Sequence, residues 1–407
     1  MAKNGLRVLV VGAGAVGGYF GGRLAQARQD VTFLVREARA QQLRERGLEI
    51  RSPHGNATIA PNIVTARELS APYDLILLAV KTYALEQAIR DFTPAMGERS
   101  AVLPVLNGMR HIDVLSASFG ASRVIGGVCV VATTLDDQGR ILQLRDDQQL
   151  TYGELDGSHS ARIDAIDATM QGAGFTARVS SSIISEMWEK WSFIAAVGAS
   201  TCLLRGSTSD ILAAPRGVEF MRALVSECAA VLDACGNPLS IDGFEKLRAR
   251  MTDPQDGLTS SMYRDLQKGA PLEADAILGD FCARGEAAGL SSPLLSAAFA
   301  QLAMYETRRP KMKESLPDDL RAGLDAYRKN ASAESWTSLS QLPVDGMDVL
   351  DALQLLKPDF PDPLPLPVED LVTDNDAFYE WAMLPNPDDV ERAIVAVLNK
   401  PPASGSA

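Results

Sequence analysis

Three glycines near the start of the chain have the spacing of a phosphate-binding turn. The segment Gly12-Ala13-Gly14-Ala15-Val16-Gly17 directly follows the apolar run Leu6–Val11 and opens a helical pattern. Gly12 permits a tight turn, Gly14 lets the backbone approach a pyrophosphate because it has no Cβ, and Gly17 allows close packing of helix on strand. The free N–H groups of the first helical turn would then face the phosphates. This arrangement predicts a dinucleotide site.

Arg36 indicates which dinucleotide binds. It lies 19 residues after Gly17, at the end of the apolar run Val31–Val35, where an acidic residue would bind the ribose 2′-hydroxyl of NAD. An arginine at this position suits the 2′-phosphate of NADP. We therefore expect NADPH as the cofactor. A solvated surface arginine is the alternative, and the neighbouring Glu37 is compatible with it.

Two more polar residues follow predicted strands. Lys81 comes after the apolar run Asp74–Val80, and Asn107 comes after Ala101–Leu106. Ligands of open α/β sheets bind beyond the carboxyl ends of the strands, so we expect both side chains to face a dinucleotide or its substrate. Asn107 followed by Gly108 is also typical of a plain turn.

The elements that would position these residues change along the chain. Up to about residue 135, short apolar runs alternate with helical patterns, which predicts βαβ units and a parallel sheet. From about Ile163 the pattern is mostly helical, and Ser180–Ser182 offer cap residues for a long helix through Leu204. We predict an α/β Rossmann domain at residues 1–178 and an all-α domain at residues 179–310.

Residues 311–407 differ in composition from the rest. They hold 18 acidic and 8 basic residues, and 11 of the 22 prolines. We predict an acidic, proline-rich extension with short helices around Leu316–Tyr327 and Val390–Val397. A solvated tail and a lid or interaction module are both compatible with this composition.

Composition excludes several classes of function. A formal net charge of -13 argues against nucleic acid as a partner, since such proteins need a basic surface, and no apolar run is long enough to span a membrane. The five cysteines and three histidines lack metal-ligand spacing, so we expect no metal site and reduced thiols in a cytoplasmic protein. We expect a small-molecule substrate as the partner.

Several segments together resemble the ketopantoate reductase family, in order from about Leu6 to about Tyr305. The matching segments are Gly12–Gly17, Lys81, Leu106-Asn107-Gly108, Tyr152-Gly153-Glu154-Leu155-Asp156-Gly157, Met187-Trp188-Glu189-Lys190, and Ser261-Met262 with Asp265, Gly269, Glu273, Asp275, Ile277 and Gly279. The last two motifs are far more specific than the glycine turn. Residues 311–407 fall outside the resemblance.

The resemblance implies a fold and a reaction. The fold is a Rossmann domain followed by an all-α domain like the C-terminal domain of 6-phosphogluconate dehydrogenase, with the active site in the cleft between them. The reaction is reduction of a 2-keto acid, typically 2-dehydropantoate, to the 2-hydroxy acid by NADPH. The implied roles are general acid for Lys190, catalysis and substrate binding for Glu273, substrate contact for Asn107, Ser261 and Asp265, and cofactor contact for Asn107, Lys81 and Arg36. A homodimer through the helical domain is compatible with this plan.

The chemistry of the residues agrees with the role that the resemblance gives Lys190. Hydride addition to a ketone leaves an alkoxide, which a nearby ammonium stabilises and protonates. Lys190 shares a helical face with Ile194 and Val197, so we expect its ammonium to be partly desolvated and readier to give up a proton. By spacing alone, Lys190 could instead be a solvent-facing lysine paired with Glu186 or Glu189. Glu273 and Asp275 could likewise be an exposed acidic helix start.

Two positions depart from the family pattern. Family members that reduce ketopantoate commonly have asparagines four and eight residues after the lysine, where this chain has Ile194 and Gly198. We therefore expect a roomier and more apolar pocket, and a bulkier ketone or an imine stays open as the substrate. An NADPH-sensing binding module is the alternative that is not an enzyme.

Overall fold

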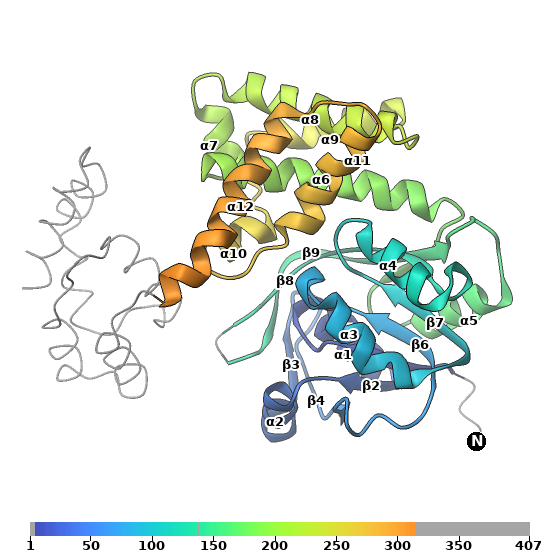
Figure 1. Cartoon of the computed structure of the whole chain (residues 1–407). Helices are drawn as coiled ribbons and strands as arrows, with labels where there is room; N and C mark the ends of the chain where they lie inside the picture. Colours follow the sequence, from blue (N-terminus) through green and yellow to red (C-terminus); the bar gives the residue numbers. More distant parts are fainter. Residues whose placement is uncertain (1–4, 137, 315–407) are drawn as a thin grey trace, which may run out of the picture. The chain divides into compact units, whose positions relative to one another are not determined.

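The computed structural model describes residues 5–136 and 138–314 of the 407-residue chain. These residues form two compact units. The first extends to Ser260 and resumes at Glu273–Phe299, and the second consists of Ser261–Leu272 and the described residues from Ala300 onward. All of the strands that the structure describes belong to the first unit (Figure 1).

A five-stranded parallel sheet begins the first unit. Its strand order is β5-β2-β1-β6-β7, and all neighbours are parallel. The strands are β1 (Arg7–Val11), β2 (Asp30–Leu34), β5 (Asn62–Val64), β6 (Tyr73–Leu78) and β7 (Met96–Pro104). Val8, Leu9 and Val10 in the central strand are fully buried, as expected for a sheet covered on both faces. β2 and β6 flank β1 on opposite sides, and ligands of open α/β sheets bind beyond the carboxyl ends of the strands at such a point.

A second sheet packs on the other side of α1 (Ala15–Gln26). Its strand order is β10-β9-β3-β4, and β8 pairs antiparallel with β9. The strands are β3 (Leu48–Arg51), β4 (Ala57–Ile59), β8 (Ile125–Leu135), β9 (Ile141–Glu154) and β10 (Thr176–Val179). Small residues let α1 approach both sheets: a Cβ on Gly21 would lie 2.7 Å from the Phe33 ring, and one on Gly22 would lie 2.8 Å from Ile50. The sequence did not predict this second sheet.

Helices and short turns complete the α/β part. The α-helices are α2 (Glu37–Arg46), α3 (Leu85–Phe92), α4 (Arg110–Phe119) and α5 (Ala161–Met170). The 3₁₀ turns are η1 (Thr82–Ala84), η2 (Thr93–Ala95) and η3 (Ala121–Arg123).

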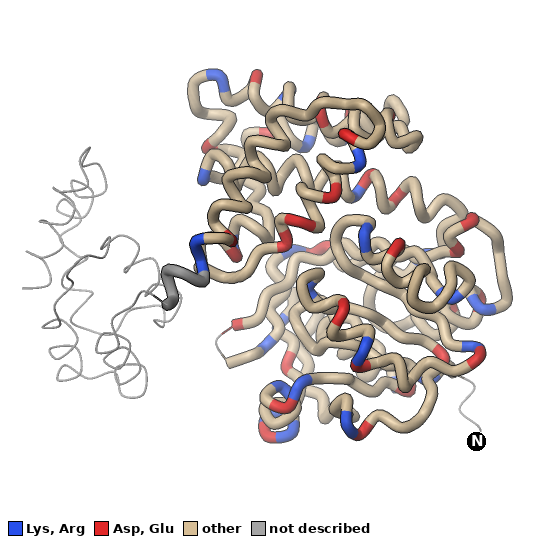
Figure 2. The backbone as a smooth tube through the Cα atoms, viewed as in Figure 1, with Lys and Arg blue, Asp and Glu red and all other residues tan. Residues whose placement is uncertain are grey.

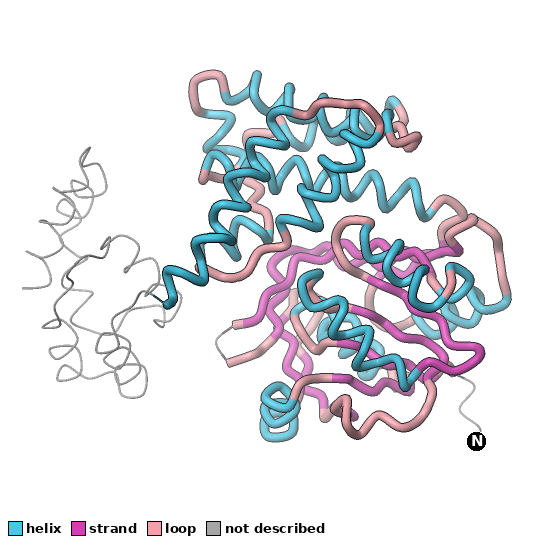
Figure 3. The backbone as a smooth tube through the Cα atoms, viewed as in Figure 1, coloured by secondary structure: helices cyan, strands magenta, loops and turns pink. Residues whose placement is uncertain are grey.

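After β10, every element that the structure describes is a helix (Figure 3). The elements in the first unit are α6 (Ile183–Leu204), α7 (Thr208–Ala213), α8 (Gly217–Ala234), α9 (Ile241–Met251), the π-helical turn η4 (Asp275–Gly279) and α11 (Asp280–Ala287). α6 is the predicted long helix, and it packs against α8 and η4 as well as β8. The predicted fold class, an α/β domain followed by an all-α domain, is confirmed.

The second unit holds α10 (Ser261–Gln267) and the later part of α12 (Pro293–Glu314), a helix that begins in the first unit. Within it, Glu306 Oε1 accepts a hydrogen bond from the Leu272 N–H at 2.7 Å, and the Tyr305 hydroxyl donates to Ala270 O at 2.9 Å. The helices predicted in the acidic extension lie outside the described residues. The domain boundaries at residues 178 and 310 stay predictions.

Acidic and basic residues are interspersed along the described chain (Figure 2), with no large region of a single sign. Of the helices described, none combines the length and the apolar character that crossing a membrane requires. Among residues 5–136 and 138–314, no three His, Cys, Asp or Glu side chains come together in a way that could hold a metal ion.

Candidate active site

The glycine turn lies between β1 and α1, and its three glycines differ in what surrounds them. Gly12 has a positive φ of 96°, and a Cβ on Gly17 would lie 2.1 Å from the Gly12 carbonyl oxygen. A Cβ on Gly14, by contrast, would meet no atom within 4 Å. Gly14 is also the N-cap of α1 and has no side chain to cap it. The turn therefore leaves open space in front of the N-terminus of α1, where no side chain caps the helix. A pyrophosphate fits such a place.

Two arginines lie at the start of α2, and one of them contacts this turn. Arg36 is exposed and is the N-cap of α2, just after β2, which is the position that the sequence analysis gave it. Arg39 was missed: its Nε donates to the Ala13 carbonyl at 3.1 Å, and burial lowers the pKa of its guanidinium. This hydrogen bond from Arg39 thus links α2 to the backbone of the glycine turn. A second arginine one helical turn after Arg36 was the available sequence signal.

Lys81 and Glu273 are brought together although they lie 192 residues apart. Lys81 Nζ is 3.2 Å from Glu273 Oε2, and the Thr82 N–H donates to Glu273 Oε1 at 3.0 Å. The Glu273 side chain is only 6% exposed, whereas that of Lys81 is 41% exposed. Glu273 is therefore not an exposed helix start, although Asp275 is exposed.

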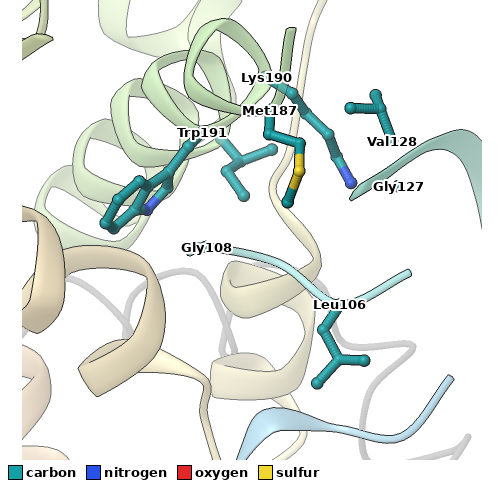
Figure 4. A pocket seen from close by; sticks show the side chains of 8 residues that line it. Leu106, Gly108, Gly127, Val128, Met187, Lys190 and Trp191 are labelled. Atoms are coloured by element: carbon teal, nitrogen blue, oxygen red, sulfur yellow. The ribbon is translucent and has the colours of Figure 1, made fainter. Parts of the chain in front are cut away.

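Lys190 extends from α6 toward Gly127 and Val128 of β8 (Figure 4). It lines a small hollow of about 10 Å³, with room for about one water molecule. The lining residues are Leu106, Gly108, Gly127, Val128, Met187, Lys190, Trp191 and Ile194. Four of them, at positions i, i+3, i+4 and i+7 from Met187 to Ile194, lie on one face of α6. The apolar side chains in this lining are those of Leu106, Val128, Met187 and Ile194.

The ammonium group of Lys190 contacts a thiol. Its Nζ lies 3.8 Å from Cys129 Sγ, and this thiol donates to the Val105 carbonyl at 3.5 Å. In the described part of the chain no carboxylate forms an ion pair with Lys190, and Glu186 pairs with Arg178 instead. The alternative of a lysine paired with Glu186 or Glu189 is therefore wrong. No sequence signal marked Cys129, which the spacing analysis treated only as a free thiol.

The loop that carries Asn107 is fixed against the helical part. A Cβ on Gly108 would lie 2.4 Å from the Ala276 carbonyl oxygen, and the Trp191 indole N–H donates to the Ile277 carbonyl at 2.9 Å. Both carbonyls belong to the π-helical turn η4, a type of distortion that is frequent at functional sites. Asn107 is therefore held between two residues that line the hollow, Leu106 and Gly108.

His111 lies in the first turn of α4, four residues after Asn107, and is 1% exposed. Burial, with the nearby positive charges of Lys190 and Arg284, lowers its pKa to about 3. The ring is therefore neutral at physiological pH and adds no positive charge beside Lys190. Sequence reasoning had considered His111 only as a metal ligand.

Four of the residues singled out in the sequence remain to be placed. Ser261 and Asp265 lie on α10, in the second unit, and their contact with substrate stays a prediction. Ile194 lines the hollow, whereas Gly198, which is also on α6, does not. The structure thus brings Lys190 and Ile194 to one hollow, and Lys81 and Glu273 to one ion pair.

Family models match most of the described chain. The model described as "Ketopantoate reductase PanE/ApbA" matches residues 8–157, and "Ketopantoate reductase PanE/ApbA C terminal" matches residues 182–306. An uncharacterized oxidoreductase of Bacillus subtilis, YkpB, is 36% identical over 304 residues, which cover 75% of this chain and 100% of that protein.

Solved structures with the same fold extend the comparison. The 2-dehydropantoate 2-reductase of Geobacter metallireducens is 26% identical with a TM-score of 0.68, covering 74% of this chain and 99% of that one. A D-mandelate dehydrogenase, solved with NADH and anilino(oxo)acetate, has the same TM-score and the same coverage at 21% identity. At that identity the likeness shows the fold alone.

Proposed function

Because this chain belongs to the ketopantoate reductase family of oxidoreductases, we propose that it uses NADPH to reduce the ketone of a 2-keto acid, 2-dehydropantoate or a related compound, to a hydroxyl group. The observation that carries this proposal is the position of Lys190, which lines a small hollow with Leu106 and Gly108, the two neighbours of Asn107. An ammonium in that environment suits proton transfer to a carbonyl oxygen.

Lys190 completes the reduction. NADPH, when bound, supplies a hydride to the carbonyl carbon, and the electron pair of the C=O π bond moves to the oxygen. The Lys190 ammonium stabilises this developing negative charge and donates one proton to it, giving the 2-hydroxy acid and a neutral amine that regains its proton from water. A positioned general acid contributes roughly 10²- to 10⁴-fold in rate.

Other residues of the chain would hold the reactants. The open space at Gly14 and the bare N-terminus of α1 fit the pyrophosphate, and Arg36 would bind the 2′-phosphate. Lys81 would lie at the cofactor's edge, and Asn107 would contact both cofactor and substrate. Glu273 would bind the substrate, and substrate contact by Ser261 and Asp265 of α10 stays a prediction.

Replacing Lys190 tests the reaction. Lys190→Ala should lower kcat for 2-keto acids at least a hundredfold while NADPH, followed by its fluorescence, still binds. Lys246→Ala is the matched control, because that lysine is 72% exposed and pairs with Asp242 on α9. If the wild-type chain binds NADPH but reduces no keto acid or imine, the reductase proposal fails and a nucleotide-sensing module takes its place.

The choice of cofactor has a separate test. Arg36→Ala should weaken NADPH binding about 10- to 100-fold, since a charge-assisted hydrogen bond is lost, and change NADH binding about threefold at most. Arg99→Ala, which removes an exposed arginine in β7, should alter neither affinity. Equal weakening of both cofactors by Arg36→Ala would favour NADH as the physiological donor.

A further inference from the structure

We infer that Arg284 is a positioning residue of this site, which acts through Trp191 and α4 on the placement of Lys190 and of the loop that carries Asn107. The inference rests on the proposed function, in which Lys190 is the general acid. Its basis is a set of contacts that joins three helices of the first unit at one guanidinium group.

Arg284 of α11 bonds to two aspartates. Its Nη2 donates to Asp113 Oδ2 of α4, and its Nε donates to Asp280 Oδ2 at 3.0 Å, one helical turn earlier on α11. Charge-assisted bonds from two nitrogens of one guanidinium restrict the direction in which its plane can face. The bond to Asp113 also connects α11 to the helix that follows the Asn107 loop.

The same guanidinium lies against two indoles of α6. Its Cζ is 5.8 Å from the centre of the Trp188 ring and 5.6 Å from that of the Trp191 ring, within the range in which an aromatic face attracts a cation. The centres of the two indoles are 5.0 Å apart, and both side chains are buried. Arg284 therefore connects this aromatic pair to Asp113 of α4.

Trp191 leads from this contact to the hollow. Its indole N–H donates to the Ile277 carbonyl at 2.9 Å, and its ring centre lies 4.9 Å from that of Phe281. It also lines the hollow and directly follows Lys190 in α6 (Figure 4). Close-packed interiors transmit displacements from one side chain to the next. A shifted Trp191 would therefore change the wall of the hollow and the backbone that carries Lys190.

The helix α4 leads from Arg284 to the Asn107 loop. Asp113 is in the first turn of α4, and Asn107 lies just before that helix. A Cβ on Gly108 would lie 2.4 Å from the Ala276 carbonyl oxygen, so the loop has little room to adjust when α4 moves. The loop and Lys190 are thus both connected to the same guanidinium.

A second arginine offers a matched comparison. The Cζ of Arg250 lies 4.2 Å from the centre of the Phe193 ring of α6, and its Nε lies 3.6 Å from Asp256 Oδ2. These are the kinds of contact that Arg284 makes, but Phe193 does not line the hollow. Arg284 and Asp113 are 28% and 64% exposed, and ion pairs that reach solvent contribute little to folding. The two arginines should therefore differ in their effect on geometry at Lys190 and not in their effect on stability.

Kinetics of the full chain give the first test. In Arg284→Met, kcat for 2-keto acids should fall about 10- to 100-fold, as for a displacement of about 1 Å at the reacting groups. The dissociation constant of NADPH, from fluorescence titration, should change by about threefold at most, since the contacts of Arg284 lie away from the glycine turn. Arg284→Lys keeps the charge but not the planar group, so its kcat should lie between those of the wild type and Arg284→Met. Arg250→Met should lower the melting temperature as much as Arg284→Met does, by about 2–4 °C, and keep the wild-type kcat.

The indole N–H of Trp191 gives a readout that needs no turnover. In NMR spectra of the isotope-labelled chain, its signal is the one that is absent from Trp191→Phe. Hydrogen exchange at this N–H should become about tenfold faster in Arg284→Met, because local opening becomes easier, and should stay within about threefold of the wild-type rate in Arg250→Met.

The two readouts separate this inference from the reductase function. Faster exchange in Arg284→Met, in a chain whose wild type reduces no keto acid, would support the hold of Arg284 on Trp191 and sink the reductase function. Unchanged exchange at Trp191 in an active enzyme would leave the reductase standing and overturn the positioning role. An equal fall of kcat in Arg284→Met and Arg250→Met would overturn it as well.

Discussion

The Nζ of Lys81 lies 3.2 Å from Oε2 of Glu273. This ion pair links the segment just after β6 to the segment just before η4. The second oxygen of Glu273 accepts the Thr82 N–H at 3.0 Å. One carboxylate therefore fastens the carboxyl edge of the parallel sheet to the helical part, and the two residues that the family pattern assigns to cofactor and substrate are in direct contact.

The contact between Lys81 and Glu273 predicts that substitutions of Glu273 lower the free energy of unfolding by different amounts. Glu273→Ala should lower the free energy of unfolding by about 1–3 kcal/mol, because the Thr82 N–H loses its acceptor. Glu273→Gln should cost less, since the amide oxygen can still accept that bond. A double-mutant cycle with Lys81→Ala, measured by urea denaturation, should give a coupling of about 1 kcal/mol, as expected for a pair with one partly exposed member. Additive effects of the two substitutions would contradict the contact.

The thiol beside Lys190 predicts a change in kcat. Cys129→Ala removes the group that the ammonium contacts at 3.8 Å, so Lys190 should sample other orientations. Loss of one hydrogen bond corresponds to about a two- to tenfold fall in kcat, with the dissociation constant of NADPH unchanged. Steady-state kinetics and fluorescence titration measure the two quantities.

Two further variants separate positioning from packing. Cys129→Ser keeps a hydroxyl that can accept from Lys190 and donate to Val105, so it should recover most of the kcat. Cys228→Ala, at another buried thiol on α8, should match Cys129→Ala in lost stability and keep full kcat. A serine variant as slow as the alanine variant would argue against a positioning role.

The pKa of His111 predicts how stability depends on pH. Burial lowers that pKa from 6.5 to about 3 in the folded chain, so the unfolded chain binds the proton first as the pH falls. The stabilisation is therefore complete above about pH 6.5 and is lost progressively toward pH 3. The free energy of unfolding should fall by up to about 1.4 kcal/mol per pH unit from this residue alone.

Two histidine variants isolate this contribution from that of the carboxylates. In His111→Gln the curve of unfolding free energy against pH should be flatter below pH 6.5 than in the wild type. His54→Gln, which removes an exposed histidine, should reproduce the wild-type slope. Parallel curves for His111→Gln and the wild type would mean that His111 can be protonated within the fold.

The parts of the fold that could be predicted are those where one physical signal dominates. β1, β6 and the second half of β7 are mostly buried, and so is most of β2, so they form largely apolar runs in the sequence. β9 gives a weaker signal because its middle residues, Leu144–Asp147, are exposed and mostly polar. Its pairing with β8 is a local hairpin, but its pairings with β3 and β10 join segments far apart in the sequence, and for that reason the second sheet was missed.

The candidate site likewise has residues that the sequence predicted and contacts that it did not. Residue type and motif position singled out Lys81, Lys190 and Glu273 one by one. The contacts of Lys81 with Glu273 and of Lys190 with Cys129 join residues that are 192 and 61 positions apart. No periodicity or local spacing encodes such pairs, since they depend on how two layers of the fold pack together.

The glycine turn gives a prediction that separates folding from cofactor binding. Gly14→Ala adds a methyl group with no atom within 4 Å, at a φ of -80° that alanine accepts. Its free energy of unfolding should stay within about 0.5 kcal/mol of the wild type. The new Cβ occupies the space through which a pyrophosphate would approach, so NADPH binding should weaken at least tenfold, as a fluorescence titration would show.

Gly17→Ala should behave in the opposite way and completes the comparison. Its Cβ would lie 2.1 Å from the Gly12 carbonyl oxygen and 2.8 Å from Ala79 Cβ, so α1 must move away from the sheet. Overpacking of this kind costs about 1–3 kcal/mol of stability, visible as a lower midpoint in urea. If Gly14→Ala instead destabilised the chain as much as Gly17→Ala, or bound NADPH normally, the open space at Gly14 would not be the cofactor's place.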